Sequence, residues 1–208
     1  MIIEVFQDTV CPWCRIGKKN LMDAVQAWTG EPILIHYRTY FLDPNVPKEG
    51  LPFRETMAAI RGDASLVEPM LNQVTEAGKS VGVTFRFDRV EMRPNTYASH
   101  VLLKMAPKDR EEEMVEAVYR AYFEEGLDIG DVAVLASIAQ DFGITAAQLQ
   151  QALDQDTYKQ EIEEDLTFAR DLQIKGVPFF VIDQKLALSG AHPVENFLRA
   201  FQQAAEEE

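Results

Sequence analysis

The first forty residues constrain the fold most, because a strand pattern, a helix pattern and a second strand pattern follow one another. Residues 1–7 form an apolar run with β-branched side chains, which predicts a strand. Residues 12–28 carry apolar side chains at helical spacing, and Pro12 suits the first turn, where its missing N–H is no loss. Residues 33–40 predict another strand. This order is typical of a right-handed crossover between parallel, buried strands, so we predict an α/β fold.

A Cys-Pro-Trp-Cys sequence, from Cys11 to Cys14, stands where the first strand gives way to the helix. A helix amino terminus presents unpaired N–H groups and a positive dipole, which favour a thiolate over a thiol. We therefore predict that Cys11 is the attacking sulfur. Cys14 lies one helical turn later, where it can displace a partner from a mixed disulfide, and we predict that it is the resolving and more shielded sulfur.

Two other uses of this cysteine pair have to be weighed. A structural zinc site needs about four ligands. His36, His100 and His192 are scattered along a chain with two cysteines, so we expect no metal. Two buried, unreactive cysteines are the other alternative. A structural disulfide framework is excluded, because two cysteines three residues apart cannot build one.

The rest of the chain predicts a helical segment, a hairpin and a final helix. Helical periodicity begins after a loop with prolines and a glycine and continues to about residue 173. Apolar runs at 179–182 and 186–188 flank a turn, which predicts a β-hairpin, and a last helix starts at about residue 193. The order is therefore βαβ, an all-helical insertion between the second and third strands, and ββα.

Composition limits the partners that the chain can have. The formal net charge of −14 opposes nonspecific binding to nucleic acid and to anionic lipid, so neither is an expected partner. No stretch approaches the roughly 20 apolar residues that span a bilayer. The amino terminus also lacks the basic start and apolar run of a secretory signal. We therefore expect a cytoplasmic protein that is not bound to a membrane.

Two segments resemble the two halves of a thioredoxin-type active site: DTVCPWC before the first helix and KGVPFFVID before the hairpin. The resemblance implies a thioredoxin-like fold and a cis peptide bond between Val177 and Pro178, which would lie against the reactive sulfur. It also implies that the Val177 backbone aligns the substrate. We expect substrate contacts at Pro12, Trp13, Val177 and Pro178, with local packing as the alternative for Trp13.

The long helical insertion resembles DsbA-like proteins, and the segments YFLDPNVP and LSGAHPVENF resemble their FrnE-type branch. We therefore expect one DsbA-like domain over residues 1–208. Its thioredoxin core would occupy about 1–45 and 174–208, and the helical insert would occupy about 46–173.

The chain departs from its relatives at three positions. The isomerases of 2-hydroxychromene-2-carboxylate and the kappa-class glutathione transferases resemble the same scaffold but place serine at the position of Cys11, which favours redox chemistry here. Thioredoxin-like enzymes often bury a carboxylate at the position of Val5, so the proton of the second thiol must pass to water or another group. Strongly oxidising DsbA proteins carry histidine where this chain has Trp13, so we expect an intermediate reduction potential.

Other polar residues near these motifs are expected to be structural. Arg15, Lys18 and Lys19 are expected to be exposed helix cations. His192 is expected to cap the final helix, and Ser189 to be a turn residue, rather than either being catalytic.

The sequence thus predicts a thiol-disulfide oxidoreductase that acts on disulfides of proteins or small molecules. It needs no cofactor beyond its own redox-active cysteine pair, with glutathione as a candidate co-substrate. Two alternatives stay open: a glutathione-dependent isomerase or transferase, and a noncatalytic chaperone or redox-sensing module. The direction of the reaction, the natural substrate and the oligomeric state cannot be inferred from these residues.

Overall fold

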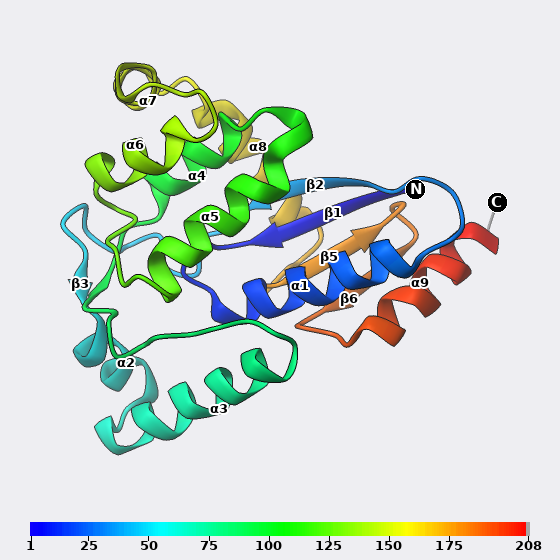
Figure 1. Ribbon diagram of the computed structural model, residues 1–208, viewed down its shortest axis with the longest axis horizontal. Helices are drawn as coiled ribbons and strands as arrows, with labels where there is room; N and C mark the ends of the chain where they lie inside the picture. The colour runs from blue at the N-terminus through cyan, green and yellow to red at the C-terminus, as the bar shows by residue number, and fades with distance from the viewer. Residues whose placement is uncertain (207–208) are drawn as a thin grey trace. The chain divides into compact units, whose positions relative to one another are not determined.

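The protein is described here by a computed structural model that covers residues 1–206, so the last two residues of the expected core segment lie outside the described residues. The chain divides into two compact units. One consists of Met1–Leu42 together with the residues from Glu164 onward, and the other is Asp43–Glu163. Figure 1 follows the chain through both units.

A four-stranded sheet forms the centre of the first unit, in the order β2-β1-β5-β6. The strands are β1 (Ile2–Gln7), β2 (Leu34–Thr39), β5 (Phe179–Ile182) and β6 (Leu186–Ser189). Strand β1 is parallel to β2 and antiparallel to β5, and β5 is antiparallel to β6. Helix α1 (Pro12–Ala27) joins β1 to β2, which confirms the predicted crossover (Figure 1).

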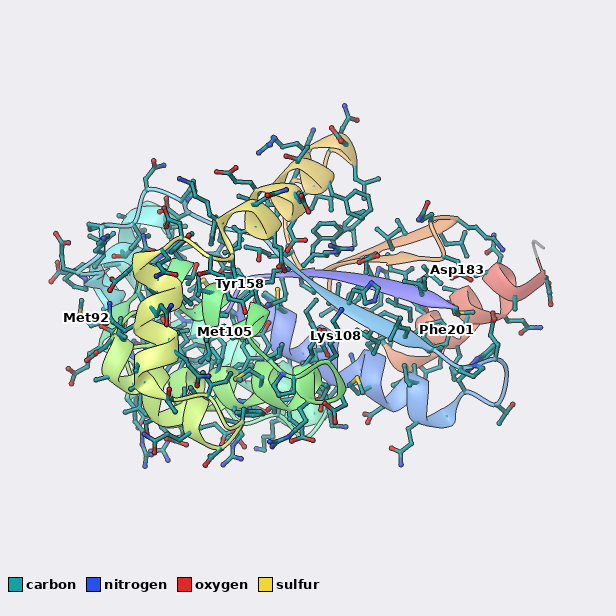
Figure 2. The ribbon with its side chains drawn as sticks, turned by 90° about the horizontal axis from the view of Figure 1, so that it is seen from above. Met92, Met105, Lys108, Tyr158, Asp183 and Phe201 are labelled. Carbon is teal, nitrogen blue, oxygen red and sulfur yellow. The ribbon has the colours of Figure 1, made fainter. Side chains whose placement is uncertain are left out.

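The main hydrophobic core of this unit lies between the sheet and helices α1 and α9 (Val194–Glu206). Alternate strand residues face it, because successive side chains of a strand point to opposite faces. Phe180 packs edge to face against Phe197, with ring centroids 4.8 Å apart. Figure 2 shows Phe201 on α9 and Asp183 at the hairpin turn, where the carboxylate accepts a 2.5 Å hydrogen bond from the backbone N–H of Ile2.

The opposite face of the sheet packs against helix α8 (Lys159–Asp171). Phe6 and Val181 lie in this second core with Ala169, and Phe6 meets Phe168 edge to face at 5.4 Å. The sheet is therefore covered on both faces, as expected for strands joined by a crossover helix.

An ion-pair network lies on the α8 face of the sheet. The Arg38 side chain donates to Glu4 at 2.6 Å and to Asp165 at 3.0 Å. Asp165 is buried on α8, and it also accepts a 2.8 Å hydrogen bond from the backbone N–H of Thr39. Asp165 therefore joins α8 to strand β2 through two hydrogen bonds, one of them charge-assisted.

The second unit is mostly helical, but it is not all-helical as predicted. Leu51–Pro52 (β3) and Met92–Arg93 (β4) pair as a two-stranded antiparallel sheet. Two residues per strand are too few to produce an alternating pattern, so the sequence gives no signal for them. The helices of this unit are α2 (Phe53–Arg61), α3 (Val67–Ser80), α4 (Tyr97–Lys104), α5 (Glu111–Phe123), α6 (Val132–Gln140) and α7 (Ala146–Asp154), with short 3-10 turns at Ala64–Leu66 and Lys108–Arg110.

Within the described residues, no helix has both the length and the apolar character needed to cross a membrane.

Candidate active site

Cys11 caps the amino terminus of helix α1, and Pro12 takes the first helical position. The backbone of Cys11 is extended, with φ −92° and ψ 108°, which is the conformation that a capping residue adopts. Its Sγ accepts a hydrogen bond from the backbone N–H of Cys14 at 3.3 Å. The first turn of α1 therefore places a backbone donor on the Cys11 sulfur.

Cys14 is a deeply buried thiol beside the first one. Its side chain is 1% exposed and that of Cys11 is 3% exposed, so the predicted difference in shielding is small. The two cysteines are not bonded to each other. Burial, followed by a hydrogen bond to the Cys11 side chain, raises the pKa of Cys14 well above its ordinary value. Cys14 therefore holds its proton more tightly than an ordinary thiol.

The loop before β5 brings the second half of the motif to Cys11. The peptide bond between Val177 and Pro178 is cis, which confirms what the resemblance implied. The Cys11 Sγ lies 3.5 Å from the carbonyl oxygen of Val177. The carbonyl of Pro178 accepts a 2.8 Å hydrogen bond from Gly190 N–H, which fixes the loop to the end of β6. The fold thus brings the Val177 carbonyl to the sulfur of Cys11, 166 positions earlier in the chain.

Gly17, which the sequence reading missed, lets helix α1 approach this loop closely. A β-carbon at this position would lie 2.9 Å from Cγ of Pro178 and 3.1 Å from Cζ of Phe180. Both distances are shorter than an ordinary carbon contact of about 3.5–4.0 Å. The available signal was a glycine inside a helix, which costs about 1 kcal/mol relative to alanine and therefore needs a packing reason.

The remaining side chains near the motif differ in exposure. Trp13 is 37% exposed between the two cysteines, so its indole is available to a substrate surface. Arg15 and Lys18 are buried, which corrects the expectation that they are exposed cations. Their charge alone suggested exposure, and the fold buries both residues. Lys19 is partly exposed and pairs with Asp23 at 2.5 Å.

His192 contacts the end of β6 and the first turn of α9. Its Nε2 lies 3.0 Å from the carbonyl of Ser189, and its Nδ1 lies 2.8 Å from Nδ2 of Asn196 on α9. Arg199 donates to Oδ1 of the same asparagine, so the amide NH₂ faces the histidine. The backbone carbonyl of His192 also accepts from Asn20 on α1, at 2.9 Å.

Asp8 is a second residue that the sequence reading missed. Its side chain is 1% exposed, and Oδ2 accepts a 2.8 Å hydrogen bond from the backbone N–H of Leu42. Its carbonyl accepts the backbone N–H of Cys11 at 3.0 Å, and its backbone also hydrogen-bonds the Cys14 sulfur. The turn between β1 and α1 is thus built around this aspartate. In the sequence it is one polar residue of a turn, which gives no sign of burial.

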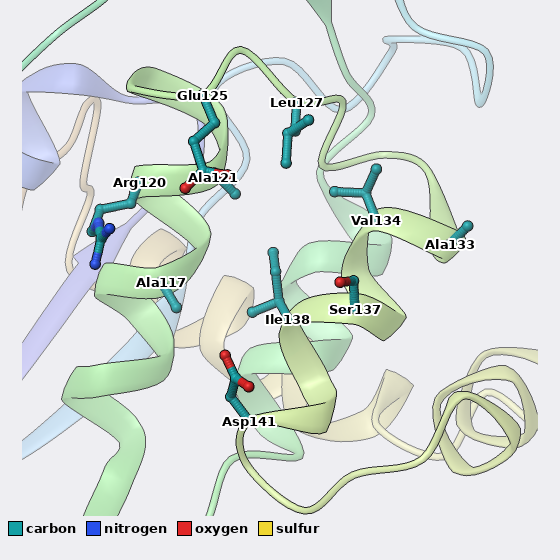
Figure 3. A pocket seen from close by; sticks show the side chains of 10 residues that line it. All are labelled: Ala117, Arg120, Ala121, Glu125, Leu127, Ala133, Val134, Ser137, Ile138 and Asp141. Carbon is teal, nitrogen blue, oxygen red and sulfur yellow. The ribbon is translucent and has the colours of Figure 1, made fainter.

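A separate hollow of about 550 Å³ lies within the second unit, between helices α5 and α6 (Figure 3). Ala121 and Ile138 contribute apolar walls, and Arg120 and Asp141 contribute charges. No cysteine or histidine is among its described lining residues, so it offers no thiol chemistry. Across residues 1–206, no three His, Cys, Asp or Glu side chains are grouped so that they could hold a metal ion.

Comparison with known proteins places this architecture in a family. The DSBA-like thioredoxin domain matches residues 2–202. The uncharacterized protein YwbO of Bacillus subtilis is 26% identical over 182 residues, which are 86% of each chain.

Solved structures agree with this match. A probable DsbA oxidoreductase of Streptomyces coelicolor is 28% identical, with a TM-score of 0.93 over 100% of this chain and 91% of the other. A 2-hydroxychromene-2-carboxylate isomerase shares the fold, with a TM-score of 0.75 and 13% identity over 100% of this chain and 97% of the other. With its cysteine pair at the start of α1 and a cis-proline loop at the Cys11 sulfur, the chain belongs to the DsbA-like thioredoxin domain family.

Proposed function

We propose that the protein is a thiol-disulfide oxidoreductase that uses Cys11 and Cys14. The observation that carries the proposal is the sulfur of Cys11, which accepts the Cys14 N–H at 3.3 Å and lies 3.5 Å from the Val177 carbonyl. The family relation and the DsbA-like neighbour support a redox enzyme in general.

The reaction proceeds in two exchanges. The Cys11 thiolate attacks a substrate disulfide, forms a mixed disulfide and releases one substrate sulfur as a thiolate. The Cys14 thiolate then attacks the Cys11 sulfur, forms the Cys11–Cys14 disulfide and releases the second substrate thiolate. The substrate gains two electrons and the dithiol loses two. The reverse sequence oxidises a substrate dithiol.

The substrate chain would bind beside the loop before β5. The Val177 carbonyl close to Cys11 can accept a backbone N–H from an extended partner, and Pro178 follows it through the cis peptide bond. Exposed Trp13 offers an apolar surface next to Pro12 in the first turn of α1. These four residues form the proposed substrate-binding set.

The test is reduction of insulin disulfides together with equilibration against glutathione. The intact chain should catalyse insulin reduction. Against glutathione it should reach a measurable dithiol-disulfide equilibrium that corresponds to an intermediate reduction potential. Cys11→Ser should be inactive. Cys14→Ser should accumulate a mixed disulfide at Cys11, which mass spectrometry detects. Inactivity of the intact chain in both assays would remove the enzyme assignment.

A glutathione-dependent isomerase or transferase is the second candidate, because a 2-hydroxychromene-2-carboxylate isomerase shares the fold. Turnover of chromene or epoxide substrates with glutathione that survives Cys14→Ser would favour it. The cysteine at position 11 instead favours redox chemistry, and we expect no such turnover. Client binding that is independent of both cysteines would favour a noncatalytic chaperone or redox-sensing module.

The substrates we propose are disulfides of proteins or small molecules, and the compartment we propose is the cytoplasm. The glutathione and thioredoxin systems of the cytoplasm keep thiols reduced. They would therefore keep the Cys11–Cys14 pair largely in its dithiol form. Cell fractionation with trapping of the Cys14→Ser mixed disulfide would identify both the compartment and the partner.

A further inference from the structure

One face of helix α1 contacts two loops of the first unit. Gly17 lies against Pro178 in the loop before β5, where an added β-carbon would come within 2.9 Å of Cγ. Asn20 lies three residues farther along the helix, and residues three apart share a helix face. The Asn20 side chain is buried, at 5% exposed. This face of α1 therefore carries a close backbone approach and, beside it, a buried amide.

The Asn20 amide fixes the turn between β6 and α9 to helix α1. Its Nδ2 donates a 2.9 Å hydrogen bond to the backbone carbonyl of His192. The N–H of His192 donates to the carbonyl of Gly190 at 2.9 Å, and the His192 ring lies 3.0 Å from the carbonyl of Ser189. These contacts within the turn hold its residues together. The hydrogen bond from Asn20 therefore positions the turn as a unit.

The same turn also holds the loop before β5. The Gly190 N–H donates a 2.8 Å hydrogen bond to the carbonyl of Pro178. Gly190 has a φ of +95°, a backbone conformation that glycine adopts without the steric cost of a β-carbon. Val177 directly precedes Pro178, and its carbonyl oxygen lies 3.5 Å from the Sγ of Cys11. A chain of contacts therefore runs from the Asn20 amide, through the turn, to the carbonyl beside the sulfur.

We propose that Asn20 is a positioning residue that keeps the Val177 carbonyl in place beside Cys11 for a bound polypeptide, an inference that rests on the proposed oxidoreductase function. An extended substrate chain donates a backbone N–H to that carbonyl while its disulfide meets the Cys11 sulfur, so the carbonyl and the sulfur must keep a fixed separation. A small disulfide has no backbone to align and needs the sulfur alone. Loss of the Asn20 donor should therefore weaken binding of protein disulfides and leave the reaction with small ones unchanged.

The variant that tests the proposal is Asn20→Leu, whose side chain has a similar size and no N–H to donate. We expect the KM for insulin reduction to rise about fivefold, the effect of one hydrogen bond of typical net strength, with kcat within about twofold. The reaction with 5,5′-dithiobis(2-nitrobenzoic acid), a small disulfide that releases coloured thiolate, should stay within about twofold. The matched control is Gln26→Leu, which removes an exposed amide from the same helix and should change neither reaction.

Amide hydrogen exchange, measured by NMR, follows the turn itself. In the intact chain the Gly190 N–H should be protected, and exchange at the rate of a free amide would overturn the inference whatever the variants do. In Asn20→Leu the Gly190 N–H should exchange about fivefold faster, because the turn has lost its hydrogen bond to α1. The Tyr40 N–H, which donates to the Gln7 carbonyl at 3.0 Å, should keep its exchange rate. Equally faster exchange at both amides would show a general loosening of the fold and would contradict a positioning role.

A second variant, Asn20→Asp, keeps the shape of the side chain and lacks an N–H donor at neutral pH. It should show the same difference between insulin and the small disulfide. An unchanged KM for insulin in either folded variant, or equal losses on both substrates, would overturn the inference. An intact chain that reacts with neither substrate would instead remove the oxidoreductase function itself.

Discussion

Replacing Gly17 with alanine tests whether the close approach of α1 to the loop before β5 positions the site. The new β-carbon would lie 2.9 Å from Cγ of Pro178. Because carbon atoms pack at about 3.5–4.0 Å, Pro178 must retreat by about 0.6 Å. Overpacking costs about 1–3 kcal/mol, and alanine recovers about 1 kcal/mol of helix propensity. We therefore expect the free energy of unfolding to fall by about 0–2 kcal/mol.

Activity should fall more than stability in this variant. A misplacement of about 1 Å can cost about a hundredfold in rate, so a shift of about 0.6 Å predicts a loss of roughly tenfold in kcat/KM. The assays are insulin reduction and urea unfolding. The matched control is Gly176→Ala in the same loop, where a β-carbon would meet no described atom within 4 Å and both quantities should stay near the intact values. Full kcat/KM in Gly17→Ala with unchanged unfolding would refute the reasoning.

Three further predictions concern burial, charge and substrate contact. Because the pKa of Cys14 is raised on folding, its contribution to stability is present below about pH 8.5, where an unfolded thiol stays protonated, and is lost as pH rises. Urea unfolding should show that the free energy of unfolding of the intact chain is about 1.4 kcal/mol lower at pH 9.5 than below pH 8.5, a loss that Cys14→Ala lacks. The same dependence on pH in the intact chain and the variant would contradict this prediction. Asp165→Ala should lower the free energy of unfolding by about 2 kcal/mol, because it leaves the buried Thr39 N–H without its acceptor and Arg38 with Glu4 alone, and a loss under about 1 kcal/mol would count against that network. Trp13→Ala should slow insulin reduction several-fold while leaving the reaction with 5,5′-dithiobis(2-nitrobenzoic acid) within about twofold, and equal losses on both substrates would exclude a role in contacting protein surfaces.

Much of the fold could be predicted because its signals are local. The apolar run of β1 and the helical spacing of α1 are each complete within one segment, and the structure keeps both. The hairpin was also predictable, and its turn uses left-handed backbone at Asp183 and Gln184. The β3–β4 pair was not predictable, because each strand has two residues and the register depends on segments about forty residues apart.

The site residues also differ in how far the sequence predicts them. The spacing of Cys11 and Cys14 is enough to predict a reactive cysteine pair. The burial of Arg15 and Lys18 depends on which face of α1 the fold covers, and that information is not in the helix pattern. The role of Gly17 depends on Pro178, which lies far along the chain and is brought beside it by the tertiary fold.

The turn between β1 and α1 sets the surroundings of both cysteines, which the Cys-Pro-Trp-Cys sequence alone does not determine. A helix start can favour a thiolate at Cys11, but the same packing buries Cys14 and keeps its proton on. A mixed disulfide at Cys11 would then persist until that proton leaves. The lifetime of the mixed disulfide, and hence the range of partners that can leave before resolution, should therefore depend on how deeply this turn buries Cys14.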